Sequence, residues 1–401
     1  MKPVSCSRPA EGRLDRANRT RFESRQTGTE IFARIRFSIG ALPDSLPTPV
    51  PSAAANALFA HRIEFQTALL AWFRREQRTL PWRTHPSLYR TVTSEFMLQQ
   101  TQVKTVLPYF DRWHRAFPDF PALAAASESD VLRQWEGLGY YSRARNLHRL
   151  AKAVVALPTI PKTVAEWQEL PGVGPYTAAA VTSIAFNTPA ACVDGNVVRI
   201  LARLTADATA FKDSASAAKQ LAPLAEALLT VATPGDHNQA MMELGATVCF
   251  RQKPLCLTCP VRIWCAGTKS GEPEAFPRLA SKIIEQRAVT RIWLIENGAL
   301  LLHRSAADAR RFANIHELPT AEQMDLNEKT FAEAVPLARK KRGITRYAIT
   351  ESIYGMTKRP ARIVHPELFW VPLAELEGIS LSGPHRRWVN ELLKTRDKTT
   401  V

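Results

Sequence analysis

Residues 170–180 read Leu-Pro-Gly-Val-Gly-Pro-Tyr-Thr-Ala-Ala-Ala, a turn with two glycines that leads straight into an alanine-rich segment. Glycine permits the tight backbone of such a turn, and Pro175 suits the first position of a helix, where its missing N–H leaves no bond unmade. The backbone N–H groups of Gly172, Val173 and Gly174 would then point outward at a helix N-terminus, where a phosphate is favoured. The pattern predicts two helices joined by a phosphate-binding hairpin, although Gly-x-Gly is also common in plain structural turns.

The sequence around this turn predicts a helical domain followed by a domain of mixed helix and strand. From residue 58 to 248, amphipathic helical periods recur and prolines separate segments of helix length. Near residue 289 the pattern changes to short apolar runs on either side of Asn297-Gly298, a strong hairpin signal because both residues tolerate positive φ. We therefore expect an all-α domain at 58–248, a cysteine-containing loop at 249–266, an exposed linker at 267–288 and an α+β domain at 289–397.

The composition points to a soluble protein with a polyanionic partner. The chain has 53 lysine and arginine residues against 37 acids, a formal charge of +16. Such an excess favours nucleic acid, although many basic proteins only have solvated basic surfaces. No apolar run approaches the roughly 20 residues that a membrane span needs, so we expect no membrane partner. Residues 1–57 are arginine-rich and then proline-rich, lack the apolar core of a secretory signal, and are expected to form a disordered extension.

Four of the six cysteines lie within one short segment, in the spacing Cys-x6-Cys-x2-Cys-x5-Cys. Free cysteine is rarely used so densely without a ligand, so the segment predicts a metal site and not disulfides or small core residues. Four thiolates at this spacing can hold either zinc or a 4Fe-4S cluster, and the spacing alone does not separate the two. The candidate ligands are Cys249, Cys256, Cys259 and Cys265.

Two carboxylates far apart in the sequence are the candidates for acid–base chemistry. Glu95 lies in a predicted helix, on a polar stripe with Gln99 and Gln102 beside the apolar face, which suggests a lined cleft. Asp194 lies between an apolar segment and the start of a helix. Each residue also has an ordinary structural interpretation, Asp194 as a helix N-cap and Glu95 as an acid in the first turn of a helix. Sequence spacing alone does not show that the two carboxylates meet.

Taken together, these segments resemble the helix-hairpin-helix, iron–sulfur superfamily of base-excision glycosylases, and within it the adenine DNA glycosylase (MutY) family. The resemblance covers about residues 60 to 270 and implies that the four cysteines hold a 4Fe-4S cluster in place of zinc. It implies a protein that acts as a monomer on double-stranded DNA and resides in the cytoplasm with the nucleoid. The matching segments are TLPWR at 79–83, SEFMLQQTQV at 94–103, GLGYYSRARNL at 137–147, LPGVG at 170–174, VDGNV at 193–197 and NQAMMELGA at 238–246.

The resemblance implies roles for individual residues in removing an adenine that lies opposite 8-oxoguanine or guanine. Glu95 would protonate N7 of the adenine and later help to activate water, while Asp194 would stabilise the positively charged sugar and Tyr176 would support Asp194. The residues implied around the extruded adenine are Arg78, Leu80, Trp82, Arg83 and Gln239. The residues implied in the DNA interface are Gln100, Tyr140, Gly172, Val173, Gly174 and Asn196. Ordinary core packing is the alternative for Leu80, Trp82 and Tyr140.

Position 176 distinguishes between branches of this superfamily. The related endonuclease III group, which removes oxidised pyrimidines and cuts the strand, has a lysine there to form a Schiff base. A phenol cannot form that imine, so Tyr176 predicts a glycosylase without efficient strand cleavage. The alternatives are an endonuclease III-like or mismatch thymine glycosylase on the same scaffold, and a non-catalytic iron–sulfur protein that binds DNA.

Residues 289–397 resemble, more weakly, the Nudix-like domain by which this family recognises 8-oxoguanine. The hydrolase signature of Nudix enzymes is absent, which implies recognition without pyrophosphatase activity. The family often has a Phe-Ser-His triplet where this chain reads Ile349-Thr350-Glu351. Thr350 keeps a hydroxyl that can accept the N7–H of 8-oxoguanine. An acid at Glu351 would repel phosphate and weaken binding to the DNA backbone, so either this strand lies differently or lesion selectivity is altered. A strand with an exposed polar face is the alternative interpretation.

Overall fold

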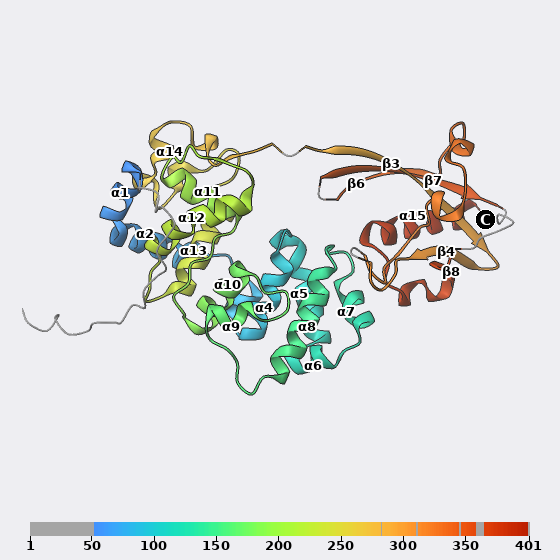
Figure 1. Ribbon diagram of the computed structural model, residues 1–401, viewed down its shortest axis with the longest axis horizontal. Helices are drawn as coiled ribbons and strands as arrows, with labels where there is room; N and C mark the ends of the chain where they lie inside the picture. The colour runs from blue at the N-terminus through green and yellow to red at the C-terminus, as the bar shows by residue number, and fades with distance from the viewer. Residues whose placement is uncertain (1–51, 282, 310–311, 345, 358–364, 400–401) are drawn as a thin grey trace, which may run out of the picture. The chain divides into compact units, whose positions relative to one another are not determined.

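The computed structural model describes residues 52–281, 283–309, 312–344, 346–357 and 365–399 (Figure 1). Most of the predicted N-terminal extension therefore lies outside the described residues. The first helix already begins at Ala53, where the Ser52 hydroxyl accepts the Ala55 N–H, so structure starts before the predicted boundary at residue 58. None of the helices in the described residues combines the length and apolar character that crossing a membrane requires.

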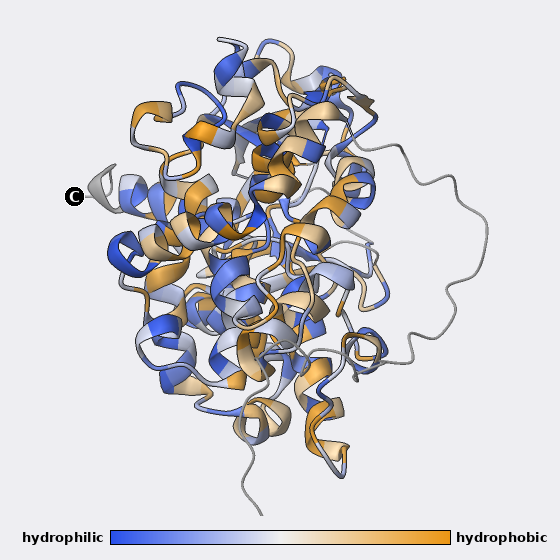
Figure 2. Ribbon diagram, turned by 90° about the vertical axis from the view of Figure 1, so that its left-hand side faces the viewer, coloured by the Kyte–Doolittle hydropathy of each residue, from blue (hydrophilic) through white to orange (hydrophobic). Residues whose placement is uncertain are grey.

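The N-terminal two thirds of the described chain is helical, as the sequence predicts. Polar and apolar residues occupy different faces of many of these helices, which is the pattern of helices packed around a core (Figure 2). The helices are α1 (Ala53–Ala60), α2 (Arg62–Glu76), α3 (Pro81–Thr84), α4 (Leu88–Leu98), α5 (Val103–Ala116), α6 (Phe120–Ala125), α7 (Glu128–Trp135), α8 (Ser142–Ala156), α9 (Val164–Gln168), α10 (Pro175–Phe186), α11 (Gly195–Leu204), α12 (Ser214–Leu228), α13 (Pro234–Thr247) and α14 (Ala266–Lys269).

Two hydrophobic cores divide these helices into two groups. The first core is built mainly from the consecutive helices α4–α10 and includes the buried indoles of Trp113, Trp135 and Trp167. The second core joins α1 and α2 to α11–α13 and the cysteine loop, so the two ends of the helical segment pack against each other. Helix α10 touches α4 in the first group and α13 in the second. The boundary between the two groups is therefore the place where residues distant in sequence can meet.

Helix α10 suits this boundary because its residues are small and it is buried on most sides. Seven consecutive residues, from Thr177 to Ser183, are buried. Close approach of α13 requires a glycine, since a Cβ at Gly235 would lie 2.6 Å from the Ser183 carbonyl oxygen. The alanine-rich sequence of α10 thus lets neighbouring helices bring their side chains together around it.

The C-terminal part has mixed helix and strand, which agrees with the predicted α+β class. Its sheet has the order β5-β4-β3-β7-β6, with β8 paired to β4. Strands β3 and β4 meet at a hairpin in which Asn297 and Gly298 have φ of 49° and 72°, as predicted from their dipeptide. The elements are β3 (Glu285–Glu296), β4 (Ala299–Arg304), β5 (His316–Glu317), β6 (Ala338–Ile344), β7 (Tyr347–Met356), β8 (Leu368–Pro372) and α15 (Gly383–Thr399).

The segment predicted as an exposed linker, residues 267–288, contains regular structure. It holds α14, a short strand β2 (Arg278–Leu279) that pairs with β1 (Ala210–Phe211), and the start of β3. Phe276 is buried in the second helical core, and its carbonyl oxygen accepts a hydrogen bond from Arg203 Nε at 3.1 Å. The segment has the glycine, proline and lysine content of a linker. It is nevertheless held by the buried Phe276 and by the pairing of β2 with β1 and of β3 with β7.

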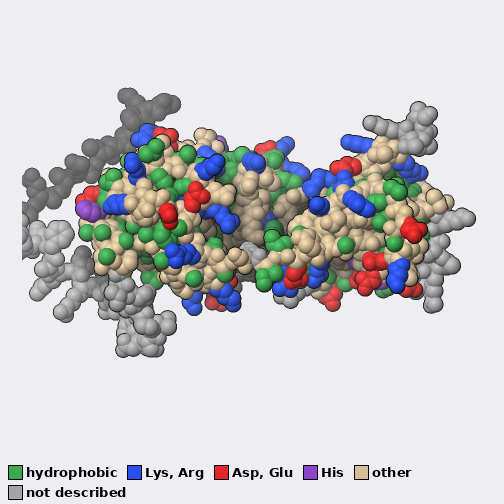
Figure 3. Space-filling model, turned by 90° about the horizontal axis from the view of Figure 1, so that it is seen from above, with side chains coloured by type: hydrophobic (Ala, Val, Ile, Leu, Met, Phe, Trp, Pro, Cys, Tyr) green, Lys and Arg blue, Asp and Glu red, His purple; other side chains and the backbone are tan. Residues whose placement is uncertain are grey.

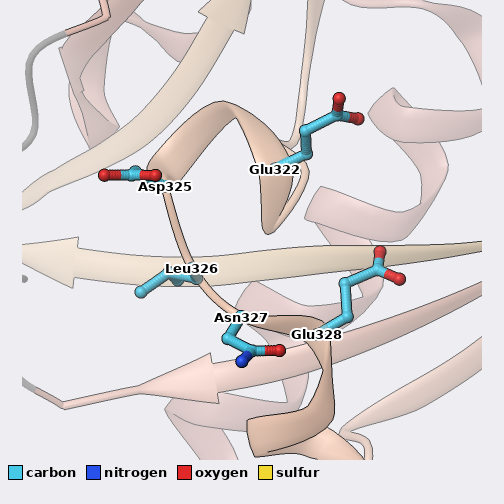
Figure 4. A pocket seen from close by; sticks show the side chains of 5 residues that line it. All are labelled: Glu322, Asp325, Leu326, Asn327 and Glu328. Carbon is cyan, nitrogen blue, oxygen red and sulfur yellow. The ribbon is translucent and has the colours of Figure 1, made fainter.

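An acidic hollow is lined by residues of the segment that connects β5 to β6 in the C-terminal part (Figure 4). Its lining carboxylates come from Glu322, Asp325 and Glu328, which are exposed, and Asp325 points away from the other two. Among the described residues, this set is not one of those close enough to share a metal ion. The hollow is therefore an ordinary solvated acidic surface.

Candidate functional site

A cleft of about 1050 Å³ lies where the two helical groups meet. Its lining includes Glu95 from α4, Tyr176 from α10 and Asp194 at the start of α11, so residues far apart in sequence share one cavity. Nine further residues for which the resemblance implies a role also line the cleft: Arg78, Leu80, Trp82, Arg83, Gln100, Gly172, Gly174, Asn196 and Gln239. Val173 and Tyr140 do not line the cleft.

Glu95 lies in the last turn of α4, so the interpretation as a first-turn acid is wrong. The residue is only 7% exposed. Burial, together with the charge of Asp194, raises the pKa of its carboxyl from 4.5 to about 7. A hydrogen bond from Tyr176 and the charge of Arg83 act in the opposite direction and limit the shift. Glu95 is consequently a carboxyl group that exchanges its proton near neutral pH.

Asp194 is the N-cap of α11, as one interpretation of the sequence predicted, and it also faces the cleft. Its Oδ1 accepts the N–H groups of Asn196 and Val197 at 2.9 and 2.8 Å, and its Oδ2 accepts Asn196 Nδ2 at 2.8 Å. Burial raises the pKa of this carboxyl, and the three hydrogen bonds oppose that shift. The cap fixes the carboxylate rigidly beside the cleft, so the structural and the functional interpretations describe one arrangement.

The Tyr176 hydroxyl lies between the two candidate carboxylates and a methionine. It is 3.1 Å from Met242 Sδ and also hydrogen-bonds Glu95. A carboxylate is the stronger acceptor of the two, so the phenol proton favours Glu95 when that group is ionised. Burial, and then the charges of Glu95 and Asp194, raise the pKa of Tyr176 well above its usual value. Tyr176 is therefore a neutral donor throughout the physiological range.

Glu243 organises the arginine side of the cleft and was not singled out from the sequence. Arg78 binds both of its oxygens, with Nε at 2.7 Å and NH2 at 2.9 Å, and Arg83 NH2 lies 3.0 Å away. Burial alone would raise the pKa of Glu243, but these arginines lower it to about 2. Arg83 in turn donates to Gln239 Oε1 at 3.1 Å. One buried carboxylate thus holds three of the predicted adenine-pocket residues in a fixed network.

Leu80 and Trp82 belong to the first hydrophobic core and also line the cleft. They are 4% and 9% exposed. Core packing and contact with the cavity are compatible because each side chain has an inner and an outer edge. The structure confirms core packing for both residues, and their contact with an extruded adenine stays a prediction.

Arg143 ties together two exposed loop tips and was also not singled out. Its guanidinium donates to the carbonyl oxygen of Met97, in the last turn of α4 before one tip, at 2.9 Å, and to that of Gly139, beside the other tip, at 3.1 Å. Gln100 and Tyr140, at the tips, have φ of 56° and 50°, in the left-handed region that side chains rarely adopt. Tyr140 is 48% exposed, so its interpretation as a core aromatic is wrong. The buried guanidinium of Arg143 therefore fixes the backbone of both loops and keeps Gln100 and Tyr140 exposed at their tips.

The glycine hairpin has the expected backbone, with one correction. Gly172 has a φ of 75°, and a Cβ there would lie 2.4 Å from Asn146 Cβ, so only glycine fits. Gly174 is the N-cap of α10 and Pro175 is its first residue, as predicted. The Val173 N–H, however, donates to the Leu170 carbonyl oxygen at 3.2 Å, because the tight turn closes on itself. Val173 packs into the core, and its N–H is not an outward donor.

The four clustered cysteines are free thiols that lie near one another in the second helical group. Burial, and then the charges of the other three, raise the pKa of Cys259 to about 12. Arg203 NH1 lies 3.3 Å from Cys249 Sγ, so a cation already faces this ligand set. Among the described residues, no three of these sulfurs gather within 4.8 Å of one another. Sulfurs around one zinc ion would lie about 3.8 Å apart, so the spacing of these sulfurs fits a metal cluster better than a single ion.

Thr350 lies on β7, on the sheet face opposite to that of Glu351. It pairs with Ala288 of β3 and Lys341 of β6, and it is partly exposed. Glu351 is fully buried, with Arg291 Nε 2.8 Å from its Oε2 and Arg342 beside Oε1. The expectation that Glu351 would repel phosphate is therefore wrong, because alternation along the strand points this acid into the domain, where arginines neutralise it.

The chain was compared with known proteins. Residues 93–226 match the profile of the HhH-GPD superfamily of base excision DNA repair proteins. The chain is 45% identical over 231 residues to the adenine DNA glycosylase of Rattus norvegicus, which covers 55% of this chain and 45% of that protein. It is 41% identical over 213 residues to the adenine DNA glycosylase of Mycobacterium tuberculosis, which covers 52% of this chain and 68% of that protein. The chain thus spans about half the length of the animal relative. A solved thermostable thymine-DNA glycosylase aligns over 53% of this chain and 99% of its own, with 27% identity and a TM-score of 0.48.

The raised pKa of Glu95 predicts how stability depends on pH. The unfolded chain ionises this carboxyl above about pH 4.5 and the folded chain only above about 7, so its ionisation disfavours folding. The contribution of Glu95 to stability is fully present below pH 4.5, the pKa of the unfolded chain, and is lost as the pH rises toward about 7, the pKa of the folded chain. Glu95→Gln is neutral at all pH values. Its free energy of unfolding, relative to that of the parent, should therefore rise by on the order of 2 kcal/mol between pH 5 and pH 8.

Thermal unfolding of the two proteins across this pH range measures the difference, and Glu226→Gln, at an exposed position of α12, is the control. A constant difference between Glu95→Gln and the parent would mean that Glu95 has an ordinary pKa.

Proposed function

Because the chain belongs to the adenine DNA glycosylase family of helix-hairpin-helix base-excision proteins, we propose that it hydrolyses the bond between adenine and deoxyribose in DNA. Its substrate is adenine opposite 8-oxoguanine or guanine. The observation that carries this proposal is the shared cleft in which Glu95, with a pKa of about 7, faces a fixed Asp194. One group that gives a proton at neutral pH and one fixed anion are what cleavage of an N-glycosidic bond requires.

Glu95 acts on the leaving base. Adenine leaves poorly as an anion, so a proton delivered to its N7 lets the electron pair of the breaking C1′–N9 bond move into the ring. With its pKa raised to about 7, Glu95 carries a proton near neutral pH and supplies it. The resulting carboxylate then takes a proton from the water that adds to C1′. The phenol of Tyr176 stabilises the ionised form between these two steps.

Asp194 acts on the sugar. Loss of the base leaves positive charge on the deoxyribose, which a nearby carboxylate stabilises directly or through a transient bond to C1′. Three hydrogen bonds keep Asp194 oriented and favour its ionised form. Tyr176 has no amine to form an imine with the opened sugar, so strand cleavage is not part of the reaction.

The adenine must leave the helix before it reaches this cleft, at a cost of a few kcal/mol. Gln100 and Tyr140, held by Arg143, are suited to enter the stack that the base vacates. Arg78, Arg83 and Gln239 offer donors and an acceptor to the edge of the extruded base, and Glu243 sets their positions. Asn196, bonded to Asp194, extends the polar edge of the cleft toward the backbone of the DNA.

The DNA backbone is bound by positive charge and by the glycine hairpin. Lysine and arginine side chains are spread over the face shown in Figure 3, in keeping with the formal charge of +16. The hairpin at Gly172 and Gly174 borders the cleft, at the N-terminus of α10, where a phosphate gains from the helix dipole. These contacts position the duplex without reading its sequence.

The four cysteines are proposed to hold a 4Fe-4S cluster. Among the described residues, no three of their sulfurs lie within 4.8 Å of one another, which favours a cluster over a single zinc ion. Arg203 and Arg199 on α11 supply positive charge toward Cys249. Cys249, Cys256, Cys259 and Cys265 would hold the cluster, and their bonds to iron would cross-link a loop that packs against the second helical core. Arg251 in the same loop lines the cleft, so the order of the loop also affects the shape of the site.

The C-terminal domain is proposed to be a Nudix-like domain that recognises the base opposite the adenine. Thr350 offers its hydroxyl from a partly exposed sheet face, next to Lys341 and Ala288. An N7–H donor distinguishes 8-oxoguanine from guanine, and a hydroxyl oxygen can accept it. The buried ion pairs of Glu351 keep this strand rigid without exposing a negative charge.

The central test is excision from defined duplexes. The parent should remove adenine opposite 8-oxoguanine and opposite guanine, and should leave thymine and oxidised pyrimidines in place. Glu95→Gln should bind the adenine duplex with unchanged affinity and lose about 10³-fold in single-turnover rate, because the proton donor is gone. Glu226→Gln should match the parent. Full turnover by Glu95→Gln, or excision of pyrimidines in place of adenine, would overturn the proposed function.

The cluster proposal predicts the metal content of the purified protein. The parent should contain four iron ions per chain and absorb visible light, whereas Cys259→Ser should lose most of its iron because one ligand is missing. Cys192→Ser is the matched control, since Cys192 is buried elsewhere and should not affect iron. A colourless parent with one zinc ion per chain would contradict the cluster.

The lesion-recognition proposal predicts a specific loss in Thr350→Val, which removes the hydroxyl but keeps the shape. In a Glu95→Gln background, the preference for 8-oxoguanine over guanine opposite adenine should fall about 5- to 10-fold, the value of one hydrogen bond. Thr290→Val, on the same sheet face opposite Ser352, is the control. Equal preference in the parent and Thr350→Val, measured by equilibrium binding, would remove Thr350 from recognition.

A further inference from the structure

A second group of candidate metal ligands lies in the C-terminal domain, separate from the cysteines and from the cleft. His303 on β4 and His365 and Glu367, just before β8, each offer one ligand atom, and these atoms lie within 4.8 Å of one another. In the part of the chain that the structure describes, this is the one such group of three. None of its members has a role in the proposed excision reaction.

The three side chains face one another in a defined geometry. His303 Nε2 lies 2.8 Å from Glu367 Oε2. The rings of His303 and His365 have their centroids 5.8 Å apart, and the Glu367 N–H reaches His365 Nδ1 at 3.3 Å. His303 is buried and the other two residues are partly exposed. The group therefore has one side in the domain and one side open to solvent, by which an ion and its water ligands can enter.

The backbone holds these ligands without help from a metal. His303 pairs with Leu368 in the β4–β8 ladder, and the Arg304 N–H donates to the Glu367 carbonyl oxygen at 2.8 Å. Two strands thus fix the positions from which the side chains project, so little order has to be gained on binding. A tetrahedral zinc site places ligand atoms about 3.4 Å apart, which small side-chain rotations achieve here.

The electrostatic surroundings also suit a cation. A neutral imidazole is the form that binds metal, so the two histidines need bring no positive charge to the group. Glu367 carries a negative charge beside His303, with its Oε2 2.8 Å from Nε2. Glu317, which pairs with His303 across β4 and β5, is already neutralised by Arg291 and Arg342. His316 of β5 and Arg304 are the opposing basic groups in this neighbourhood.

We propose that His303, His365 and Glu367 bind a divalent ion of the zinc class, with water completing its coordination. Two imidazoles and one carboxylate are donors that zinc prefers, whereas magnesium and calcium prefer oxygen ligands alone. The ion connects β4 to the segment that leads into β8, and so stabilises the sheet edge of the domain. A plain hydrogen bond between His303 and Glu367 would need no third ligand, and His365 is therefore the residue that distinguishes the two interpretations.

Zinc binding to the full, untagged, iron-loaded chain tests this proposal. After removal of loose metal by a chelator, zinc is titrated in competition with a chromophoric chelator, and iron is measured alongside to show that the cysteines stay loaded. The parent should bind one zinc ion per chain, and His365→Ala and Glu367→Gln should bind it at least about tenfold more weakly. His61→Ala, an exposed histidine 3.9 Å from Glu64, should bind zinc like the parent.

Thermal unfolding gives a second readout, because an ion that binds only the folded chain raises the unfolding temperature. Zinc should raise it for the parent and for His61→Ala, and should leave it unchanged for His365→Ala, whose metal-free transition should match the parent. Equal zinc affinity in the parent and His365→Ala, or no binding by the parent at 100 µM zinc, would overturn the site. Neither readout involves adenine excision, so the two proposals stand or fall separately.

Discussion

The burial of one uncompensated carboxyl group, that of Glu95, is the constraint on which the cleft depends. The chain buries at least two other glutamates, and it treats them differently. Glu243 and Glu351 each lie against two arginines, which lower the pKa of both carboxyls below the usual value. Glu95 has a phenol as hydrogen-bond partner and an aspartate nearby, and the charge of Arg83 does not offset burial, so the pKa of Glu95 is raised to about 7. The same residue type is thus a structural anion at two positions and a carboxyl with a raised pKa at the third, because of what surrounds it.

That arrangement follows from how the helices are ordered in space. Glu95, Tyr176 and Asp194 lie on or next to α4, α10 and α11, and the small residues of α10 let its neighbours approach closely. A hydrogen-bonded frame then limits the freedom of each group. Asp194 is fixed by the backbone of its own helix, the arginines by Glu243, and the exposed tips at Gln100 and Tyr140 by Arg143. Rigid placement of this kind is what allows a few side chains to act together on one substrate.

Local sequence patterns predicted the features that local chemistry determines. The glycine hairpin, the Asn297-Gly298 turn and the division into helical and mixed parts follow from backbone preferences, and the resemblance of short motifs brought Glu95, Tyr176 and Asp194 together. Glu243 and Arg143 were missed because their partners lie far away in the sequence or are carbonyl oxygens, which leave no pattern. The direction of Glu351 and the use of the Val173 N–H were wrong for the same reason, since each is decided by packing or by turn closure. Where the sequence offered two interpretations, as for Asp194, Leu80 and Trp82, both proved compatible.

The division of the helical region into two cores has a consequence for biosynthesis. The core of α4–α10 is formed mainly by one continuous stretch of chain, so it can assemble while later residues are still being made on the ribosome. The other core needs α1 and α2 together with α11–α13 and the cysteine loop, so the first helices to emerge must wait for more than 100 residues of nascent chain before they find their partners. Until then their apolar faces stay exposed, and the cysteines, which come last, close the structure and complete the boundary at which the cleft lies.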